Sequence, residues 1–238
     1  MLNYQDIFQN KKKVLFVTAH PDDVDVMYAG TIAKLREDKR QVFVVVVTNG
    51  ARGSRDNKIS ETKLAKIRES EQINALKELG VPKENFVTLN YKDGEAEPNM
   101  ELIGKIAYYI RKFKPDLVAT QDPESLYIKF GNDHAYVNHK DHRVTGIATM
   151  DAVYPFSRDL SFFPEHAKEG VTPHTVQEII FMGDGNLKID ITDVIEKKKK
   201  ALIAHKSQFD AKTVPGMLEW WKKDGKYFES GTYLNLGH

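Results

Sequence analysis

The stretch Val14-Leu15-Phe16-Val17-Thr18-Ala19-His20-Pro21-Asp22-Asp23 decides the fold and locates the chemistry. Its apolar half predicts a buried strand, and its polar half predicts a turn into a helix. The imidazole of His20 and two adjacent carboxylates therefore follow the carboxyl end of a strand. In open α/β sheets, ligands bind at that edge.

Short apolar runs alternate with helical patterns along the rest of the chain. Strands are expected at 14–18, 42–47, 86–89, 116–120, 176–182 and 189–191, and helices at 24–35, 64–79, 103–113, 139–153 and 192–205. A long loop is expected between the fourth strand and the helix that starts at 139. This order favours a mostly parallel sheet with helices on both faces. We therefore expect an α/β protein with a three-layer Rossmann-like fold, built as one domain over residues 1–238.

Composition narrows the class of protein. The 238 residues include no cysteine, which excludes disulfides, thiolate metal ligands and a cysteine nucleophile, and is typical of a reducing compartment. Lys plus Arg number 35 and Asp plus Glu 34, so the net charge of +1 indicates neither a nucleic-acid nor a membrane partner. No apolar run is long enough to span a bilayer, and residues 1–13 lack the apolar core of a signal peptide. We expect a cytoplasmic protein.

A second polar cluster, His139-Lys140-Asp141-His142, lies at the start of a later expected helix. A catalytic zinc site has three protein ligands, and His20, Asp23 and His142 can supply a two-histidine, one-carboxylate set. Fe²⁺ suits the same donors. The two clusters together predict a hydrolytic metal site.

Three polar groups of the two clusters remain free for acid–base work. Asp22 is suited to act as a general base beside metal-bound water. His139 is suited to donate a proton to a leaving amine or to bind an oxyanion. Asp141 is expected to accept from the ring N–H of His139 and fix its tautomer.

Structural roles compete with these assignments. Asp22 or Asp23 taken alone is also typical of a helix N-cap, and the two histidines of the second cluster are also compatible with an ordinary surface. Arg52 and Arg55 lie in the glycine-containing loop after the second strand, where they either bind substrate or are solvated.

Later in the chain, three features are interpreted as structural. The run Lys197–Lys200 is interpreted as a solvated helix face, and His205 as a packed or hydrogen-bonded histidine. The pair Trp220-Trp221 is interpreted as core or interface packing, with stacking on a sugar ring as the alternative.

The motifs resemble those of the LmbE-like, or PIG-L, family of zinc-dependent N-acetylglucosaminyl deacetylases. The similarity begins at Ala19-His20-Pro21-Asp22-Asp23, continues through Ala29-Gly30-Thr31-Ile32-Ala33 and Lys114-Pro115-Asp116, and includes His139-Lys140-Asp141-His142 and Ala204-His205-Lys206-Ser207-Gln208. The similarity extends over nearly the whole chain. Within the family, the motifs resemble those of the N-acetylchitobiose deacetylases most. Deacetylases of the bacillithiol and mycothiol pathways are the nearby alternatives.

The resemblance implies a Rossmann-like hydrolase that removes acetate from an N-acetylglucosamine-containing small molecule. It implies zinc on His20, Asp23 and His142, with Asp22 as the base, and a homo-oligomer. Some members carry a tyrosine two residues before the first histidine of the second cluster. Here Val137 holds that position, and Tyr136 precedes it, so Tyr136 is the candidate for substrate contact.

Two other classes of protein remain as alternatives. A binding module with the same fold would have no use for Asp22 and His139, which are not needed to hold a ligand. A dinucleotide-binding domain would carry G-x-G-x-x-G at the first strand-to-helix turn, where this chain has two carboxylates that repel a pyrophosphate. The enzyme class is favoured.

Overall fold

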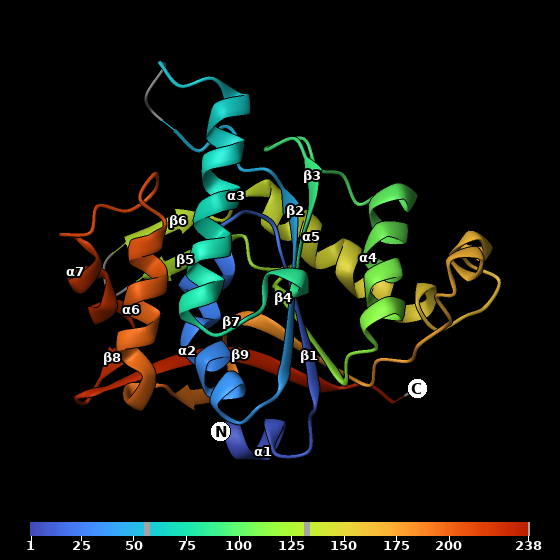
Figure 1. Ribbon diagram of the computed structural model, residues 1–238. Coiled ribbons are helices and arrows are strands. Elements are labelled where there is room, and N and C mark those ends of the chain that lie inside the picture. The colour runs from blue at the N-terminus through green and yellow to red at the C-terminus, as the bar shows by residue number, and fades with distance from the viewer. Residues whose placement is uncertain (55–57, 131–133, 238) are drawn as a thin grey trace.

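A seven-stranded sheet lies between two groups of helices in the computed structural model, which describes residues 1–54, 58–130 and 134–237 (Figure 1). The strand order is β3-β2-β1-β4-β7-β9-β8. The bounds are β1 Lys13–Thr18, β2 Gln41–Thr48, β3 Phe86–Tyr91, β4 Leu117–Gln121, β7 Glu178–Asp190, β8 Lys222–Lys223 and β9 Lys226–Asn235. The first five strands in this order are parallel, and β9 and β8 are antiparallel to their neighbours. The expected three-layer α/β fold is confirmed.

Helices cover both faces of the sheet. Their bounds are α1 Tyr4–Phe8, α2 Asp23–Glu37, α3 Glu61–Glu78, α4 Met100–Phe113, α5 Lys140–Asp151, α6 Ile195–Ala204 and α7 Val214–Leu218. Short helical turns follow at Lys83–Asn85, Ala152–Phe156, Pro164–Glu169, Thr192–Val194 and Glu219–Trp221. Figure 1 shows α2, α3 and α6 on one side of the sheet and α4 and α5 on the other.

The alternation of side chains along β1 divides the core in two. Val14 and Phe16 pack with α1, α2 and α3, whereas Leu15 and Val17 pack with α4 and α5. All four side chains are at most 1% exposed. Burial on both faces explains why the sequence of this strand is apolar at successive positions.

The structure differs from the sequence-based expectation at the edge of the sheet. The expected strands at 176–182 and 189–191 are one strand, β7, whose register shifts between Met182 and Leu187, where Gly183 has a φ of 136°. The expected loop after β4 contains a hairpin, β5 Tyr127–Phe130 and β6 His134–Val137. The strand β9 was not expected, because about half of its residues are polar and its order comes from pairing with β7.

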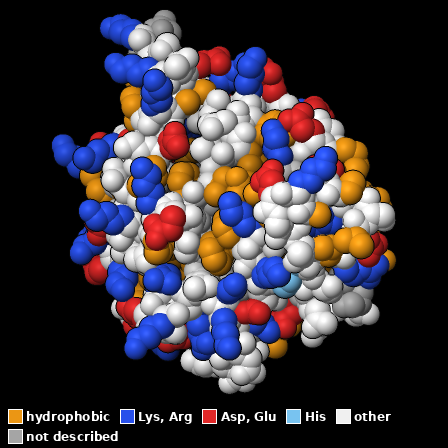
Figure 2. Space-filling model, turned by 45° about the vertical axis from the view of Figure 1, so that its right-hand side comes forward, with side chains coloured by type: hydrophobic (Ala, Val, Ile, Leu, Met, Phe, Trp, Pro, Cys, Tyr) orange, Lys and Arg blue, Asp and Glu red, His pale blue; other side chains and the backbone are white. Residues whose placement is uncertain are grey.

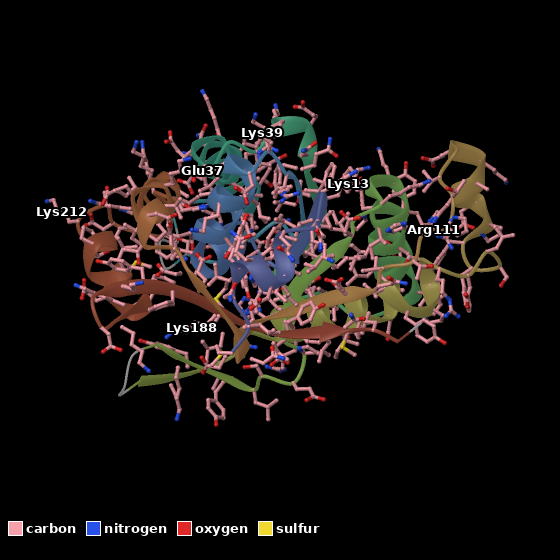
Figure 3. All side chains as sticks on the ribbon, turned by 90° about the horizontal axis from the view of Figure 1, so that it is seen from below. Lys13, Glu37, Lys39, Arg111, Lys188 and Lys212 are labelled. Atoms are coloured by element: carbon pink, nitrogen blue, oxygen red, sulfur yellow. The ribbon has the colours of Figure 1, made fainter. Side chains whose placement is uncertain are left out.

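One buried arginine organises the segment between α5 and β7. Arg111 projects from α4 toward that segment (Figure 3), and its guanidinium donates to the backbone carbonyls of five residues at 2.9–3.3 Å. The acceptors are Phe156, Ser157, Asp159, Phe162 and Phe163. Its other contact is His166 Nδ1 at 3.1 Å. The carbonyls of Ser157, Asp159 and Phe163 also accept from backbone amides, so Arg111 adds a shared donor that joins this segment to α4.

Acidic and basic side chains are interspersed over the face of the molecule in Figure 2, as the balanced composition requires. Among the described residues, no helix combines the length and the apolar character that crossing a membrane requires.

Candidate metal centre and active site

Two histidines and a carboxylate converge at the carboxyl edge of the sheet. His20 follows β1, Asp23 opens α2 and His142 lies in the first turn of α5. His20 Nδ1 lies 3.2 Å from His142 Nε2 and 3.3 Å from Asp23 Oδ2, and His142 Nε2 lies 3.2 Å from Asp23 Oδ1. The structure thus brings together the three residues that the sequence proposed as ligands.

Neighbouring polar groups hold two of these donors in place. Asn138 Oδ1 lies 2.7 Å from His142 Nδ1, so the other ring nitrogen of His142 faces the centre. Gln121 Nε2 donates to Asp23 Oδ2 at 2.9 Å. Such outer contacts fix the orientation of metal ligands. The sequence interpretation missed Gln121 and Asn138, although Gln121 ends a strand at the same edge of the sheet.

His20 has carboxylates on its second ring nitrogen. Its Nε2 lies 3.3 Å from Asp93 Oδ1 and 3.4 Å from Asp141 Oδ2. Although burial opposes the shift, the contact with His20 is the main cause that lowers the pKa of Asp93 to about 2. Asp93 follows β3, so a search for carboxylates after every expected strand would have found it.

The expected pairing of Asp141 with His139 is not what the structure contains. Asp141 Oδ2 is 3.9 Å from His139 Nδ1, and that nitrogen instead accepts from the backbone amide of Asp141 at 3.1 Å. The carboxylate accepts from the amide of Gly94 at 2.7 Å and faces His20. The expected contact does not form because His139 is the N-cap of α5 and turns its ring back onto the helix.

Asp22 is held apart from the ligands as a separate carboxylate. It occupies the N-cap position of α2, yet its side chain makes no capping bond and pairs with Arg68 at 3.1 Å. Its backbone has a φ of 112°, a region that side chains disfavour, and its amide donates to Gln72 Oε1 at 2.9 Å. Burial raises the pKa of the Asp22 carboxyl, although the guanidinium of Arg68 opposes this.

His139 lies on the open side of the centre. Its ring packs edge-on against His20, with the ring centroids 4.7 Å apart, and about half of its side chain is exposed. Burial, followed by the charge of His20, lowers the pKa of His139. A neutral imidazole at this place can accept or donate a hydrogen bond to a ligand.

A cavity of about 740 Å³ opens beside the centre. Asp23, His139 and His142 are among the residues that line it. The aromatic side chains in its wall are Tyr127, Tyr136, Trp220, Trp221 and Phe228, contributed by the β5–β6 hairpin and the C-terminal segment. Tyr136, which the sequence analysis proposed for substrate contact, is thus one of the residues that line this cavity.

Arg52, one of the two arginines proposed for substrate, is not among the residues that line this cavity. Arg52 donates to Glu61, to Glu95 and to the backbone carbonyl of Asp93, so it supports the turn that carries Asp93. Arg55 lies outside the described residues.

The donors fit a divalent transition metal. Two imidazole nitrogens and one carboxylate, mutually within 3.3 Å, make a set that such an ion would draw together. A second group of close donors, His20 with Asp93, His139 and Asp141, shares His20 with the first. Because Asp93 and Asp141 contact the nitrogen of His20 that faces away from Asp23, they are placed to orient the ring.

Fold and site together define an α/β enzyme of hydrolytic type with a candidate metal centre at the carboxyl edge of its sheet. The chain belongs to the PIG-L family: the family model described as "GlcNAc-PI de-N-acetylase" matches residues 15–153.

Individual proteins similar to this chain support the same family assignment. A diacetylchitobiose deacetylase of Thermococcus kodakarensis is 33% identical over 204 residues, which are 85% of this chain and 72% of that protein. A Bacillus anthracis protein named "Probable N-acetyl-alpha-D-glucosaminyl L-malate deacetylase 2" is 29% identical over 86% of this chain and 84% of its own length. The solved structure of N,N'-diacetylchitobiose deacetylase from Pyrococcus horikoshii superposes with a TM-score of 0.84 at 30% identity, covering 98% of this chain and 87% of that one.

Proposed function

We propose that this protein is a metal-dependent N-deacetylase that hydrolyses the acetamido group of an N-acetylglucosamine-containing small molecule, releasing acetate and a free amine. The observation that carries the proposal is the set of His20, Asp23 and His142 within 3.3 Å of one another, of which Asp23 and His142 line the cavity. The family and the three deacetylase relatives support it. We propose Zn²⁺ as the ion, with Fe²⁺ as the alternative.

The residues around the centre can divide the chemistry between them. The bound ion would supply Lewis acidity, which polarises a carbonyl and lowers the pKa of water. Asp22, oriented by Arg68, takes a proton from the water whose oxygen bonds to the acetamide carbon. His139 donates a hydrogen bond toward the carbonyl oxygen from the open side. As the C–N bond breaks, the amine takes the proton that Asp22 received from the water, either directly or through His139.

The charges of the cavity wall favour a neutral sugar as the group attached to the N-acetylglucosamine ring that reacts. Besides the centre, the described residues that line it carry the carboxylates of Asp122, Glu124 and Asp184 against the ammonium of Lys129. A wall with this excess of negative charge disfavours an anionic partner such as malate. The aromatic side chains on the other walls suit the apolar face of a sugar ring. We therefore propose a saccharide rather than an acidic conjugate as the preferred substrate.

Acetate release tests the proposed function. Metal-loaded protein is offered N-acetylglucosamine, N,N'-diacetylchitobiose and N-acetylglucosaminyl malate. Release from the neutral sugars in preference to the malate conjugate is expected. Replacing both Glu124 by Gln and Asp184 by Asn should narrow the preference between diacetylchitobiose and the malate conjugate. No acetate from any of the three, with stoichiometric metal bound, would contradict the proposal in favour of a binding module.

The cellular compartment and the oligomeric state of the protein are also proposed. The absence of cysteine supports a reducing compartment, and we propose the cytoplasm. We also propose that residues 1–238 act as one domain, that the protein forms a homo-oligomer, and that its partners are small molecules rather than nucleic acid or membrane.

A further inference from the structure

The helix that carries the proposed metal ligand and base is broken. Within α2, Tyr28 has φ −138° and ψ 18°, which are not helical values. In an unbroken helix the amide of Gly30 would donate to the carbonyl of Val26. Here the amide of Gly30 donates to Glu229 Oε1 at 2.9 Å, and the amide of Thr31 donates to Glu229 Oε2 at 2.7 Å. The second half of α2 therefore starts on a carboxylate from β9.

A buried lysine serves the other side of the break. Lys198 of α6 donates from Nζ to the carbonyls of Val26 at 2.6 Å and Asp25 at 3.3 Å, and it pairs with Glu229 Oε1 at 2.7 Å. Both charged side chains are fully buried. The ion pair is thus inserted into the helix at the position of the missing bond. The interpretation of Lys197–Lys200 as a solvated face is wrong for Lys198.

The signs of the two charges suit the two helix ends. The ammonium lies at the carboxyl end of the first segment, and the carboxylate lies at the amino end of the second, each opposite the helix dipole it meets. Buried amides and carbonyls without partners would destabilise the fold. The ion pair stabilises the break because it forms hydrogen bonds with these groups. Its presence therefore points to a use for the break itself.

The first segment is also anchored at its other end. Asp25 Oδ2 accepts from Gln72 Nε2 at 2.6 Å and lies 2.8 Å from His205 Nε2. Gln72 in turn accepts from the amide of Asp22. His205 is thus the hydrogen-bonded structural histidine that the sequence indicated. Buried contacts from α3, α6 and β9 fix the turn that carries the base and Asp23.

The second segment has a separate constraint. A Cβ on Gly30 would lie 2.7 Å from the side chain of Ile191, so this part of α2 is pressed against the chain that follows β7. If α2 were straight, this packing would also fix the direction in which its N-terminal turn presents Asp22 and Asp23. The break lets the first turn point toward His142 independently.

We infer that Lys198 and Glu229 are positioning residues for the metal centre, holding the break in α2 that aims Asp22 and Asp23. The inference rests on the proposed function. The pair also supports the cavity, because the ammonium of Lys198 lies 4.1 Å from the ring centroid of Trp221, a residue of the cavity wall. Turnover and metal geometry should therefore both depend on two residues that touch neither metal nor substrate.

The test removes both charges at once, because a single substitution leaves an unpaired buried charge. In Lys198→Met/Glu229→Gln the methionine keeps most of the stem, and the glutamine keeps an acceptor for the amides of α2. The matched control is Lys34→Met/Asp193→Asn, which removes an exposed ion pair of 2.7 Å on the second half of the same helix. Metal-free protein is titrated with Co²⁺, whose visible absorption reports ligand geometry.

The double variant should fold cooperatively, show an altered Co²⁺ spectrum and bind Co²⁺ about 10–100-fold more weakly. With zinc, kcat should fall by more than KM rises, because the loss of the contact with Trp221 affects only the cavity wall. The control should match wild type in every readout. A folded double variant with the wild-type spectrum and affinity overturns the inference.

A second variant keeps the test decisive if the double variant does not fold. Lys198→Arg retains the charge for Glu229 but presents a wider, planar group to the carbonyl of Val26. It should fold and still change the Co²⁺ spectrum, and an unchanged spectrum again overturns the inference. Wild-type protein that binds Co²⁺ yet releases no acetate contradicts the proposed function alone.

Discussion

Replacing Asp22 by asparagine should separate turnover from metal binding. The substitution keeps the size of the side chain and removes its charge and basicity. Asp22 is not one of the three converging donors, because its carboxylate pairs with Arg68 at 3.1 Å. Metal should therefore stay bound at the wild-type stoichiometry while the proposed proton acceptor is lost.

The size of each effect follows from the surroundings of the carboxylate. A positioned general base contributes about 10²–10⁴ in rate, equivalent to roughly 3–5 kcal/mol in the barrier. Stability should change by less than about 1 kcal/mol, because burial raises the pKa of Asp22 and the folded state thus disfavours its charge. Arg68 also keeps its contacts with the carbonyls of Pro21 at 2.6 Å and Gly50 at 2.8 Å.

Three measurements on one preparation check this reasoning. Acetate release gives kcat, elemental analysis gives bound metal, and urea denaturation gives the free energy of unfolding. Asp23→Ala is the comparison, and it should lose metal and activity together. A kcat for Asp22→Asn within threefold of wild type would refute the general-base role, and a loss of metal would show that Asp22 is a ligand.

Three further substitutions test the supports of the site and fold. Asp93→Asn weakens the contact with His20 Nε2, so metal affinity in a chelator competition should fall about 10–100-fold, and an unchanged affinity would contradict the orienting role. Arg111→Met removes one donor from five carbonyls, of which only those of Ser157, Asp159 and Phe163 keep a backbone donor, and it should lower the free energy of unfolding in urea by about 2–4 kcal/mol; less than about 1 would show that water replaces the guanidinium. Gly146→Ala places a Cβ 2.4 Å from the carbonyl oxygen of Gln121 and should cost about 1–3 kcal/mol in a thermal melt, whereas Gly216→Ala, with open space around it, should not destabilise.

The alternation of apolar runs and helical patterns was enough to predict the layers of the fold. Strands such as β1 are buried on both faces, so their sequence is apolar throughout and is recognised without a partner. The antiparallel edge was missed because β9 is half polar and is ordered by pairing with β7. The β5–β6 hairpin was missed because each of its strands is only four residues long and pairs only with the other, outside the main sheet.

The sequence by itself determined the centre of the site, because parallel strands end at one edge. Any polar cluster that follows such a strand must lie near the others, as His20 and His142 do across 122 residues. The surroundings of the centre were decided only by tertiary packing. Lys198 stands in a run of four lysines, and nothing local separates the buried one from its neighbours. It is buried because α6 packs against the break in α2 opposite Glu229, and a carboxylate 31 residues further on compensates its charge.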